Sequence, residues 1–336
     1  MRRWGMSLEA FNAGLTAWHE GRFFDAHEHW EDAWRAATDD GTAVALKGLI
    51  QLAASLHKAD SGEAEGHRKL WTKARQHLHE GAEALGALHG IDLVAFFEAL
   101  PEGPGLPHHL PALPEHVSAF GVLYLHGFGS SPTSPKGAAV QGAIQPSGTP
   151  MAAPSLADDA DFFEFTVTRS LRRARRCLFD RTLLVGSSLG GWIGSLLARD
   201  DPRVVELILL CPAYRYPDRW RRPERAEELA RWRSEGQLDF EVGHPPHRLP
   251  LSVTFIEDAF GHDAAVQPTV PTTIYHGRQD DVVPLRDVAP IVEGLPNVEL
   301  HVVDDDHGLR STLPEIARLC LARAEALRGQ GGSRDR

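Results

Sequence analysis

A serine between two glycines, in the stretch Gly186-Ser187-Ser188-Leu189-Gly190, has the spacing of a turn that presents a catalytic nucleophile. A serine hydroxyl attacks a carbonyl carbon only when a base takes its proton and a rigid turn holds it clear of the backbone. The apolar run 182–185 and the helical pattern after the turn supply that rigidity, and glycines fit where a Cβ atom would be crowded. We therefore predict that Ser188 is a nucleophile. The alternative is a glycine-rich turn without a catalytic role.

Two later loops carry the groups that would activate this serine. The predicted strand 298–303 leads to His307, and the predicted strand 272–275 leads to Asp280 and Asp281. His307 would take the proton of the serine and return it to the leaving group, while an aspartate would fix the tautomer of the imidazole. The chain order serine, aspartate, histidine favours this assignment. Asp280 is the predicted partner and Asp281 the alternative; a helix-capping aspartate and a solvated histidine are the non-catalytic interpretation.

A glycine-rich loop after the predicted strand 120–125 completes the candidate site. The loop reads His126-Gly127-Phe128-Gly129, and its glycines allow a substrate to approach the backbone closely. We predict that the backbone N–H groups of Phe128 and Leu189 bind the oxyanion that forms when the serine attacks. The residues expected to support the loop and the turn are His126, Gly127, Gly186 and Gly190. The alternative is an ordinary strand-to-helix turn.

The elements that must position these groups alternate between strand and helix over residues 118–327, which predicts a small, mostly parallel, doubly wound sheet covered by helices. The expected strands are 120–125, 149–151, 182–185, 204–210, 272–275 and 298–303. The expected helices are 135–144, 160–178, 189–200, 285–294 and 313–327. Residues 212–263 interrupt this alternation and should form a cap over the carboxyl ends of the strands. The tail 328–336 is expected to be disordered.

Residues 1–100 show only helical periodicity and predict a separate all-helical bundle. The expected helices are about 8–20, 24–37, 44–58, 63–85 and 93–100. The proline-rich segment 101–117 that follows should be a semi-rigid spacer, because repeated prolines lock φ and remove hydrogen-bond donors.

A polar cluster stands out in the helical region. His27 and Glu31 are four residues apart on one helical face, and His57 lies in an otherwise apolar stretch. Two histidines and a carboxylate could bind a metal ion, so a metal-dependent activity of this region is one hypothesis. We favour the other interpretation, a buried and satisfied histidine–glutamate pair, and predict no metal site.

The helical region resembles a known family. The motif from Phe23 to Trp34, followed by Leu46 to Ala54 and by His57, resembles the helical family known as domain of unknown function 309 over about residues 8–85. The resemblance implies an all-helical fold and no settled activity. It places the characteristic polar residues of the family at His27, Glu28, Glu31 and His57.

The motifs around Phe128, Ser188, Asp280 and His307 together resemble an α/β-hydrolase, and the stretch 123–132 further resembles compact bacterial esterases of the YqiA type. The resemblance covers about residues 119–327. It implies Ser188 as nucleophile, Asp280 and His307 as its partners, and Phe128 and Leu189 as oxyanion donors. One departure is visible, because the sheet begins with the strand that leads to the oxyanion loop and lacks the first two strands of the full fold.

We thus expect a serine hydrolase that cleaves a small carboxylic ester or thioester through an acyl-enzyme and needs no cofactor. A non-catalytic two-domain scaffold is the rival hypothesis from another class. Within the predicted cap, a basic and aromatic composition could select acidic or bulky esters, although an amphipathic helix with a solvated face is the simpler interpretation. The arginines and tryptophans concerned are Arg215, Arg219, Arg221, Arg222, Arg225, Arg231, Arg233, Trp220 and Trp232.

Composition bounds the remaining possibilities. The net charge of −11 argues against nucleic acid or a membrane surface as a general partner. The three widely spaced cysteines predict reduced thiols of a cytoplasmic protein, and no secretory leader or membrane-spanning run of about 20 apolar residues is recognised.

Overall fold

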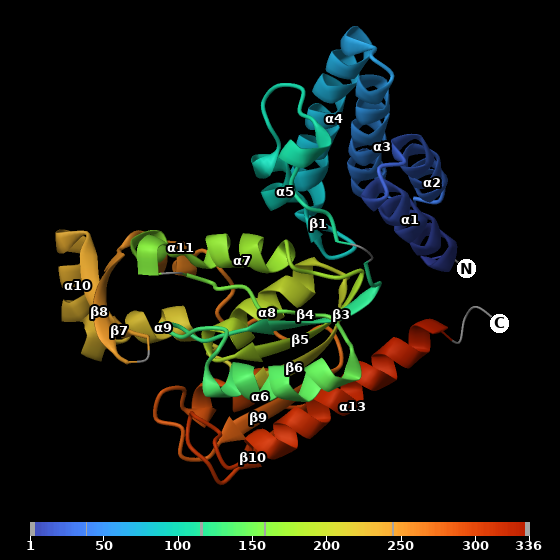
Figure 1. Cartoon of the computed structure of the whole chain (residues 1–336). Helices are drawn as coiled ribbons and strands as arrows, with labels where there is room; N and C mark the ends of the chain where they lie inside the picture. Colours follow the sequence, from blue (N-terminus) through green and yellow to red (C-terminus); the bar gives the residue numbers. More distant parts are fainter. Residues whose placement is uncertain (1–3, 38, 115–116, 158, 244, 333–336) are drawn as a thin grey trace. The chain divides into compact units, whose positions relative to one another are not determined.

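Helices dominate the first hundred residues, and strands alternate with helices thereafter, as the two sequence patterns predict (Figure 1). The structure is a computed structural model that describes residues 4–37, 39–114, 117–157, 159–243 and 245–332. The chain divides into two units with separate cores. The helical unit comprises residues up to 119 together with 175–180, and the sheet unit comprises 120–174 and the residues from 181 on.

The helical unit is built on amphipathic helices close to the predicted ranges. They are α1 (Trp4–His19), α2 (Phe23–Arg35), α3 (Asp40–Asp60), α4 (Ala64–Leu85) and α5 (Leu93–Ala99). Two short strands, β1 (Ala87–Leu88) and β2 (Ile91–Asp92), pair between α4 and α5. The long helices α3 and α4 approach closely because Gly81 has no side chain: a Cβ there would lie 2.7 Å from the Cα of Ala45. Trp30 and Trp71 fill the core that results.

The proline-rich segment 101–117 is anchored on the helical unit. Its described residues include a 3-10 turn, Pro107–His109. Beyond this turn, Leu113 and Val117 are buried in the helical core, and the Asn12 side-chain amide donates to the Val117 carbonyl while its oxygen accepts from the Val117 N–H. Burial of Leu113 and Val117 removes apolar surface from water, which stabilises the packing of this segment on the helical unit.

The sheet unit contains a six-stranded parallel sheet in the order β10-β9-β6-β5-β3-β4. Its strands are β3 (Phe120–Leu125), β4 (Met151–Ala152), β5 (Arg181–Ser187), β6 (Val204–Leu210), β9 (Thr272–Gly277) and β10 (Val298–Val303). Its helices are α6 (Pro135–Ile144), α7 (Val167–Arg175), α8 (Leu189–Asp200), α12 (Ala289–Val292) and α13 (Leu313–Gly332). Helices α6 and α13 pack together on one face of the sheet, and α7 and α8 lie on the other (Figure 1). All six residues of β3 are buried, as expected for an inner parallel strand.

Two predicted helical ranges and the predicted disordered tail of this unit need correction. The range 160–178 is divided into a 3-10 helix, Asp159–Glu164, and α7, because Thr166 caps α7 by accepting from the Arg169 N–H. The range 285–294 shrinks to a 3-10 turn and the short α12, since Pro290 lacks the N–H that a continuous helix would use. The expected disorder after 327 is wrong up to Gly332, where α13 ends, and residues 333–336 lie outside the described part.

The cap, residues 212–263, contains more than the predicted amphipathic helix. Its elements are α9 (Tyr216–Trp220), α10 (Ala226–Glu235), β7 (Gln237–Val242), β8 (His247–Ser252) and α11 (Thr254–Phe260). Strands β7 and β8 form an antiparallel hairpin that the sequence analysis did not predict. The indole N–H of Trp232 on α10 donates to the Leu251 carbonyl at 3.0 Å, and its ring packs 5.1 Å from that of Phe240. These contacts pack α10 against the hairpin.

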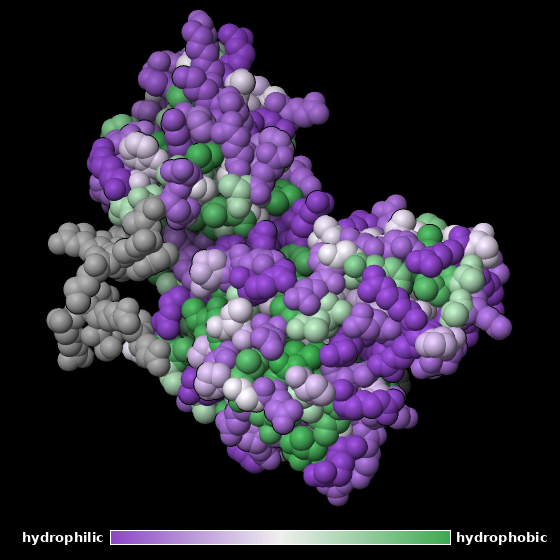
Figure 2. Space-filling view, turned by 180° about the vertical axis from the view of Figure 1, so that it is seen from behind, coloured by the Kyte–Doolittle hydropathy of each residue, from purple (hydrophilic) through white to green (hydrophobic). Residues whose placement is uncertain are grey.

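Hydrophilic side chains cover much of the visible surface, with smaller hydrophobic patches interspersed (Figure 2). None of the helices in the described part of the chain combines the length and the apolarity that crossing a bilayer would require.

Candidate active site

Ser188 lies on the sharp turn between β5 and α8, with φ 52° and ψ −118°. Backbone hydrogen bonds hold this turn from two directions. The Ser188 N–H donates to the Leu210 carbonyl at 2.9 Å, and the Ser188 carbonyl accepts from the N–H groups of Gly191 and Ala213, each at 2.9 Å. A non-glycine residue in such a conformation costs roughly 1–3 kcal/mol, which the surrounding structure must offset. The turn therefore holds the hydroxyl of Ser188 in a fixed position.

The two glycines of the motif have a steric reason. A Cβ on Gly190 would lie 2.5 Å from the His126 carbonyl oxygen, and a Cβ on Gly186 would lie 2.7 Å from the Gly190 carbonyl oxygen. Backbone atoms cannot yield to such contacts as a flexible side chain could. Both positions thus require glycine if strand β3, strand β5 and helix α8 are to meet at this turn.

His307 is held by Asp280, which follows β9. The Nδ1 atom of His307 lies 2.7 Å from Oδ2 of Asp280, whose side chain is fully buried. The other oxygen, Oδ1, accepts from the N–H groups of Val282 and Val283 at 3.0 and 2.7 Å. Burial alone would raise the pKa of Asp280, but the bonds from His307 and Val283 hold it below its ordinary value. The carboxylate is therefore ionised, so Nδ1 of His307 carries the proton and Nε2 is left as the basic atom.

The neighbouring Asp281 does not take this place. Its side chain is exposed and faces the cavity in front of Ser188. Of the two aspartates considered from the sequence, the structure brings Asp280 to His307.

A buried layer lies behind Asp280. Cys211, His276 and Asp280 each place a ligand atom within 4.8 Å of the others. His276 Nε2 lies 2.8 Å from the Val283 carbonyl oxygen, and burial lowers the pKa of His276 and raises that of Cys211 to about 12. Both side chains are thus neutral, and the Cys211 thiol hydrogen-bonds to the Asp280 carboxylate. The sequence analysis missed this layer, although both residues lie at the carboxyl ends of predicted strands.

The predicted oxyanion loop lies against the serine. A Cβ on Gly127 would be 3.2 Å from the Cβ of Ser188, so a larger residue there would crowd the candidate nucleophile. Within the described residues, the N–H groups of Phe128 and Leu189 donate to no protein acceptor. They are therefore available to an oxyanion.

His126 fixes the conformation of this loop. Its Nε2 accepts from the Leu156 N–H at 2.9 Å, so the proton of the neutral ring is on Nδ1, which donates to the Gly127 carbonyl at 2.8 Å. The predicted supporting role of His126 thus has a geometric basis.

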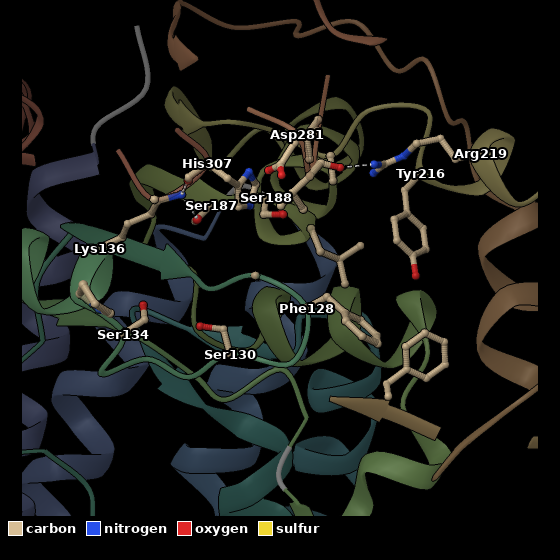
Figure 3. A pocket seen from close by; sticks show the side chains of 18 of the residues that line it. Phe128, Ser130, Ser134, Lys136, Ser187, Ser188, Tyr216, Arg219, Asp281 and His307 are labelled. Carbon is tan, nitrogen blue, oxygen red and sulfur yellow. Dashed lines mark hydrogen bonds between the residues drawn. The ribbon is translucent and has the colours of Figure 1, made fainter. Parts of the chain in front are cut away.

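A cavity of about 630 Å³ opens in front of these groups (Figure 3). Ser188, His307 and Gly127 are among the residues that line it. Aromatic side chains from the oxyanion loop and the cap line its walls: Phe128, Tyr216, Trp220 and Phe240. Charged side chains also reach it: Lys136, Arg219, Arg225, Arg310 and Asp281. Aromatic walls with a small set of convergent polar and charged groups are typical of a small-molecule site.

Lys136, which the sequence analysis did not single out, reaches this site from the first turn of α6. It is 7% exposed, and its Nζ donates to the His307 carbonyl at 2.6 Å and to the Ser187 hydroxyl at 3.3 Å. Figure 3 shows its side chain directed at the loop of His307. Burial lowers the pKa of Lys136. A lysine after Ser-Pro at a helix start gives no sign in the sequence that it is buried.

The polar cluster of the helical unit lies on its surface. His27 Nδ1 is 3.0 Å from Glu28 Oε1, and His27 Nε2 is 3.6 Å from Glu31 Oε1. His57 instead contacts the ring of Phe24, which is 52% exposed. The expected histidine–glutamate pair therefore forms, but it is not buried: the side chains of His27 and Glu31 are 23% and 33% exposed. Among the described residues these side chains also form no group of three metal-ligating atoms.

Comparison with protein families assigns both units. The model of an uncharacterised protein family, UPF0227, matches residues 121–321, and the model of domain of unknown function DUF309 matches residues 11–70. The chain belongs to the UPF0227 family. Both resemblances inferred from the sequence are thereby confirmed, as is the order of a helical unit followed by an α/β-hydrolase fold. No curated protein sequence matches this UPF0227 member.

Solved structures similar to the UPF0227 region are α/β-hydrolases. Alpha/beta hydrolase domain-containing protein 10 from mouse is 22% identical, with a TM-score of 0.52 over 62% of this chain and 90% of the mouse chain. Est1E from Butyrivibrio proteoclasticus, solved with ferulic acid bound, is 20% identical, with a TM-score of 0.50 over 60% of this chain and 86% of its own. At these identities the similarity establishes the fold.

Proposed function

We propose that this protein is a serine hydrolase that cleaves a carboxylic ester or thioester through an acyl-enzyme on Ser188. The observation that carries the proposal is the 2.7 Å hydrogen bond between Asp280 and His307, because His307 lines the same cavity as Ser188, which lies on a strained turn. A buried carboxylate on Nδ1 is the arrangement that prepares an imidazole to act as a base through Nε2.

The reaction follows from these positions. Nε2 of His307 takes the proton of Ser188, and Oγ forms a bond to the carbonyl carbon of the substrate. The carbonyl oxygen becomes an oxyanion, which accepts hydrogen bonds from the N–H groups of Phe128 and Leu189. The bond to the leaving alcohol or thiol then breaks, and His307 returns the proton to that group.

The second half of the reaction releases the acyl group. A water molecule gives a proton to His307 and attacks the ester carbon of the acyl-enzyme, and collapse of the second tetrahedral intermediate returns the proton to Ser188 Oγ. Asp280 keeps its charge throughout and stabilises the imidazolium that forms twice in each cycle.

A fluorophosphonate probe tests the serine mechanism. The full chain should be labelled and should hydrolyse short p-nitrophenyl esters, and Ser188→Ala should abolish both. The matched control is Ser187→Ala, which removes the adjacent hydroxyl and should leave the label in place. A folded wild-type protein that is not labelled, or turnover that persists in Ser188→Ala, would refute the proposal.

A further inference from the structure

The cavity wall is positively charged although the whole chain carries a net charge of −11. Four cations reach the cavity, from Lys136, Arg219, Arg225 and Arg310, against the single carboxylate of Asp281. A local field opposite in sign to the whole protein favours a negatively charged ligand.

Two other arginines of the cap are paired with carboxylates and lie outside the cavity lining. Arg222 pairs with Asp287 at 2.7 Å, and Arg233 pairs with Glu257 at 2.7 Å. The simpler interpretation of the basic cap, a solvated and ion-paired face, therefore holds for these residues. It does not account for Arg219, which lines the cavity.

Arg219 lines the cavity without a countercharge among the described residues. It makes no ion pair with a carboxylate of the described residues, and within that part of the chain its guanidinium donates to the neutral carbonyl oxygen of Val282 (Figure 3). Its Nε atom is buried and has no acceptor in the described part of the chain. Burial lowers the pKa of Arg219, which reports the loss of hydration around a group that stays charged. An anion at this position would restore the lost interactions.

The surrounding side chains define what else the ligand must contain. The Arg219 guanidinium lies 5.5 Å from the ring centre of Tyr216, and Trp220 and Phe240 continue the aromatic wall. Arg225 lies 4.6 Å over Trp220 and pairs with Glu228 at 3.1 Å, so it retains only part of its charge for a ligand. The cavity thus offers an apolar stretch with a cation beside it.

We propose that the ester cleaved at Ser188 carries a carboxylate that binds Arg219, with an apolar or aromatic segment between the carboxylate and the scissile bond. This inference rests on the proposed serine-hydrolase function. The bond would consist of charge-assisted N–H donation from the guanidinium to the carboxylate oxygens.

Two pairs of substrates test this inference and cover both sides of the scissile bond. The acyl side is tested with mono-p-nitrophenyl esters of glutarate, adipate, suberate and sebacate against the same esters with the distal carboxylate methylated. The alcohol side is tested with 3-carboxy-4-nitrophenyl butyrate against 4-nitrophenyl butyrate. In at least one pair the wild type should show a kcat/KM roughly 10–100-fold higher for the carboxylate, the range expected of a hydrogen bond to a charged group.

The variants are compared by the ratio of kcat/KM values within that pair. Arg219→Gln should bring the ratio close to one, mainly through KM, and Arg219→Lys should recover part of it. The matched control is Arg231→Gln, which removes the same charge from an exposed position of α10 outside the cavity and should keep the wild-type ratio.

The outcomes separate the two proposals. Equal turnover of charged and neutral esters by the wild type would overturn the carboxylate inference while Ser188-dependent activity stands. An Arg219→Gln variant whose kcat/KM falls by the same factor for the charged and the neutral ester would also overturn it. Arg219 would then act only by holding Val282 beside Asp280. Activity that survives Ser188→Ala would instead contradict the serine mechanism itself.

Discussion

Lys136 donates a 2.6 Å hydrogen bond to the main-chain carbonyl oxygen of His307 and so ties the first turn of α6 to the loop of the candidate base. The same Nζ also reaches the hydroxyl of Ser187, next to the candidate nucleophile. Its nearest acidic neighbours, Asp280, Asp305 and Asp306, interact with it only through space. A buried cation bound to neutral acceptors is a poor contributor to stability.

Replacing this cation should separate stability from activity. Lys136→Met removes the desolvation penalty of a buried charge, so the Tm should equal or exceed that of the wild type. The loop of His307 loses its anchor, so kcat on a neutral ester should fall by roughly 10–100-fold, the effect expected of a displaced catalytic group. Lys136→Gln keeps a donor and should recover part of the rate. A Met variant with normal kcat and a lowered Tm would show that Lys136 serves only the fold.

The lowered pKa of Lys136 predicts that the free energy of unfolding depends on pH in the alkaline range. Its pKa is lower in the folded protein than in the unfolded chain, so the unfolded state binds more protons between the two values. The free energy of unfolding of the wild type, relative to Lys136→Met, should therefore rise as the pH increases toward the unfolded pKa of about 10.4. Urea unfolding of both proteins from pH 7 to pH 10 measures this difference. A difference that stays constant or falls with pH would contradict the assignment.

The choice between adjacent aspartates can be tested directly. Asp280→Asn should leave His307 without its ionised partner and lower kcat/KM by roughly 10³–10⁴-fold, as expected when the wrong tautomer is stabilised. Asp281→Asn should lower kcat/KM on neutral esters by less than roughly tenfold, because Asp281 only lines the cavity. Ester hydrolysis by the two variants under identical conditions gives the comparison. Equal losses of kcat/KM in the two variants would contradict the assignment of Asp280 as the partner of His307.

Asp305 predicts an acid dependence of stability. Its carboxylate accepts from the N–H groups of Asp306, Ser311 and Thr312 and from the Thr312 hydroxyl, at 2.9–3.1 Å. Burial alone would raise the pKa of Asp305, but these donors hold it below its ordinary value. The resulting stability is present above the unfolded pKa of about 3.9 and is lost as pH falls through the folded pKa.

The corresponding variant is Asp305→Asn. It should lower the free energy of unfolding by about 1–3 kcal/mol at pH 7, with a smaller difference from the wild type below about pH 4. Chemical unfolding at pH 7 and in acid measures both values. A deficit independent of pH would show that packing, and not the charge, accounts for the effect.

Glycine positions provide a matched pair of stability tests. Gly190→Ala forces a Cβ into the carbonyl oxygens of Leu125 and His126 and should destabilise the protein by about 1–3 kcal/mol or more. Gly142→Ala, on an exposed part of α6 with no atom near its Cβ, should stabilise it by about 0.5–1 kcal/mol. Thermal unfolding of the two variants checks both signs. A neutral Gly190→Ala would mean that the turn is looser than the geometry indicates.

Much of the fold follows from local sequence. The ranges 120–125, 204–210 and 298–303 are predicted without error. The first two are inner parallel strands that are largely buried and appear as short apolar runs. Asp280 and His307 are predicted because chain order and strand ends restrict where a partner for Ser188 can lie. These signals can be read from local patterns and from their order along the chain.

The features that sequence analysis missed depend on distant partners. Lys136 is buried by a loop 171 residues away, which no local pattern encodes. Arg219 looks like the other cap arginines in the sequence, and only the fold shows which of them are paired with carboxylates. The surface position of His27 was also missed, because i,i+4 spacing defines a helix face but not what covers that face.

The strained backbone of Ser188 predicts how this position would change if its hydroxyl were no longer needed. A glycine would adopt φ 52° without strain, so folding stability alone favours glycine at this position over the serine that is present. A descendant relieved of the need for a hydroxyl would gain stability from a single substitution, with the sheet and the glycines of the turn unchanged. Among relatives of this protein that keep the fold and lose catalysis, glycine in place of Ser188 should therefore be the first substitution to appear.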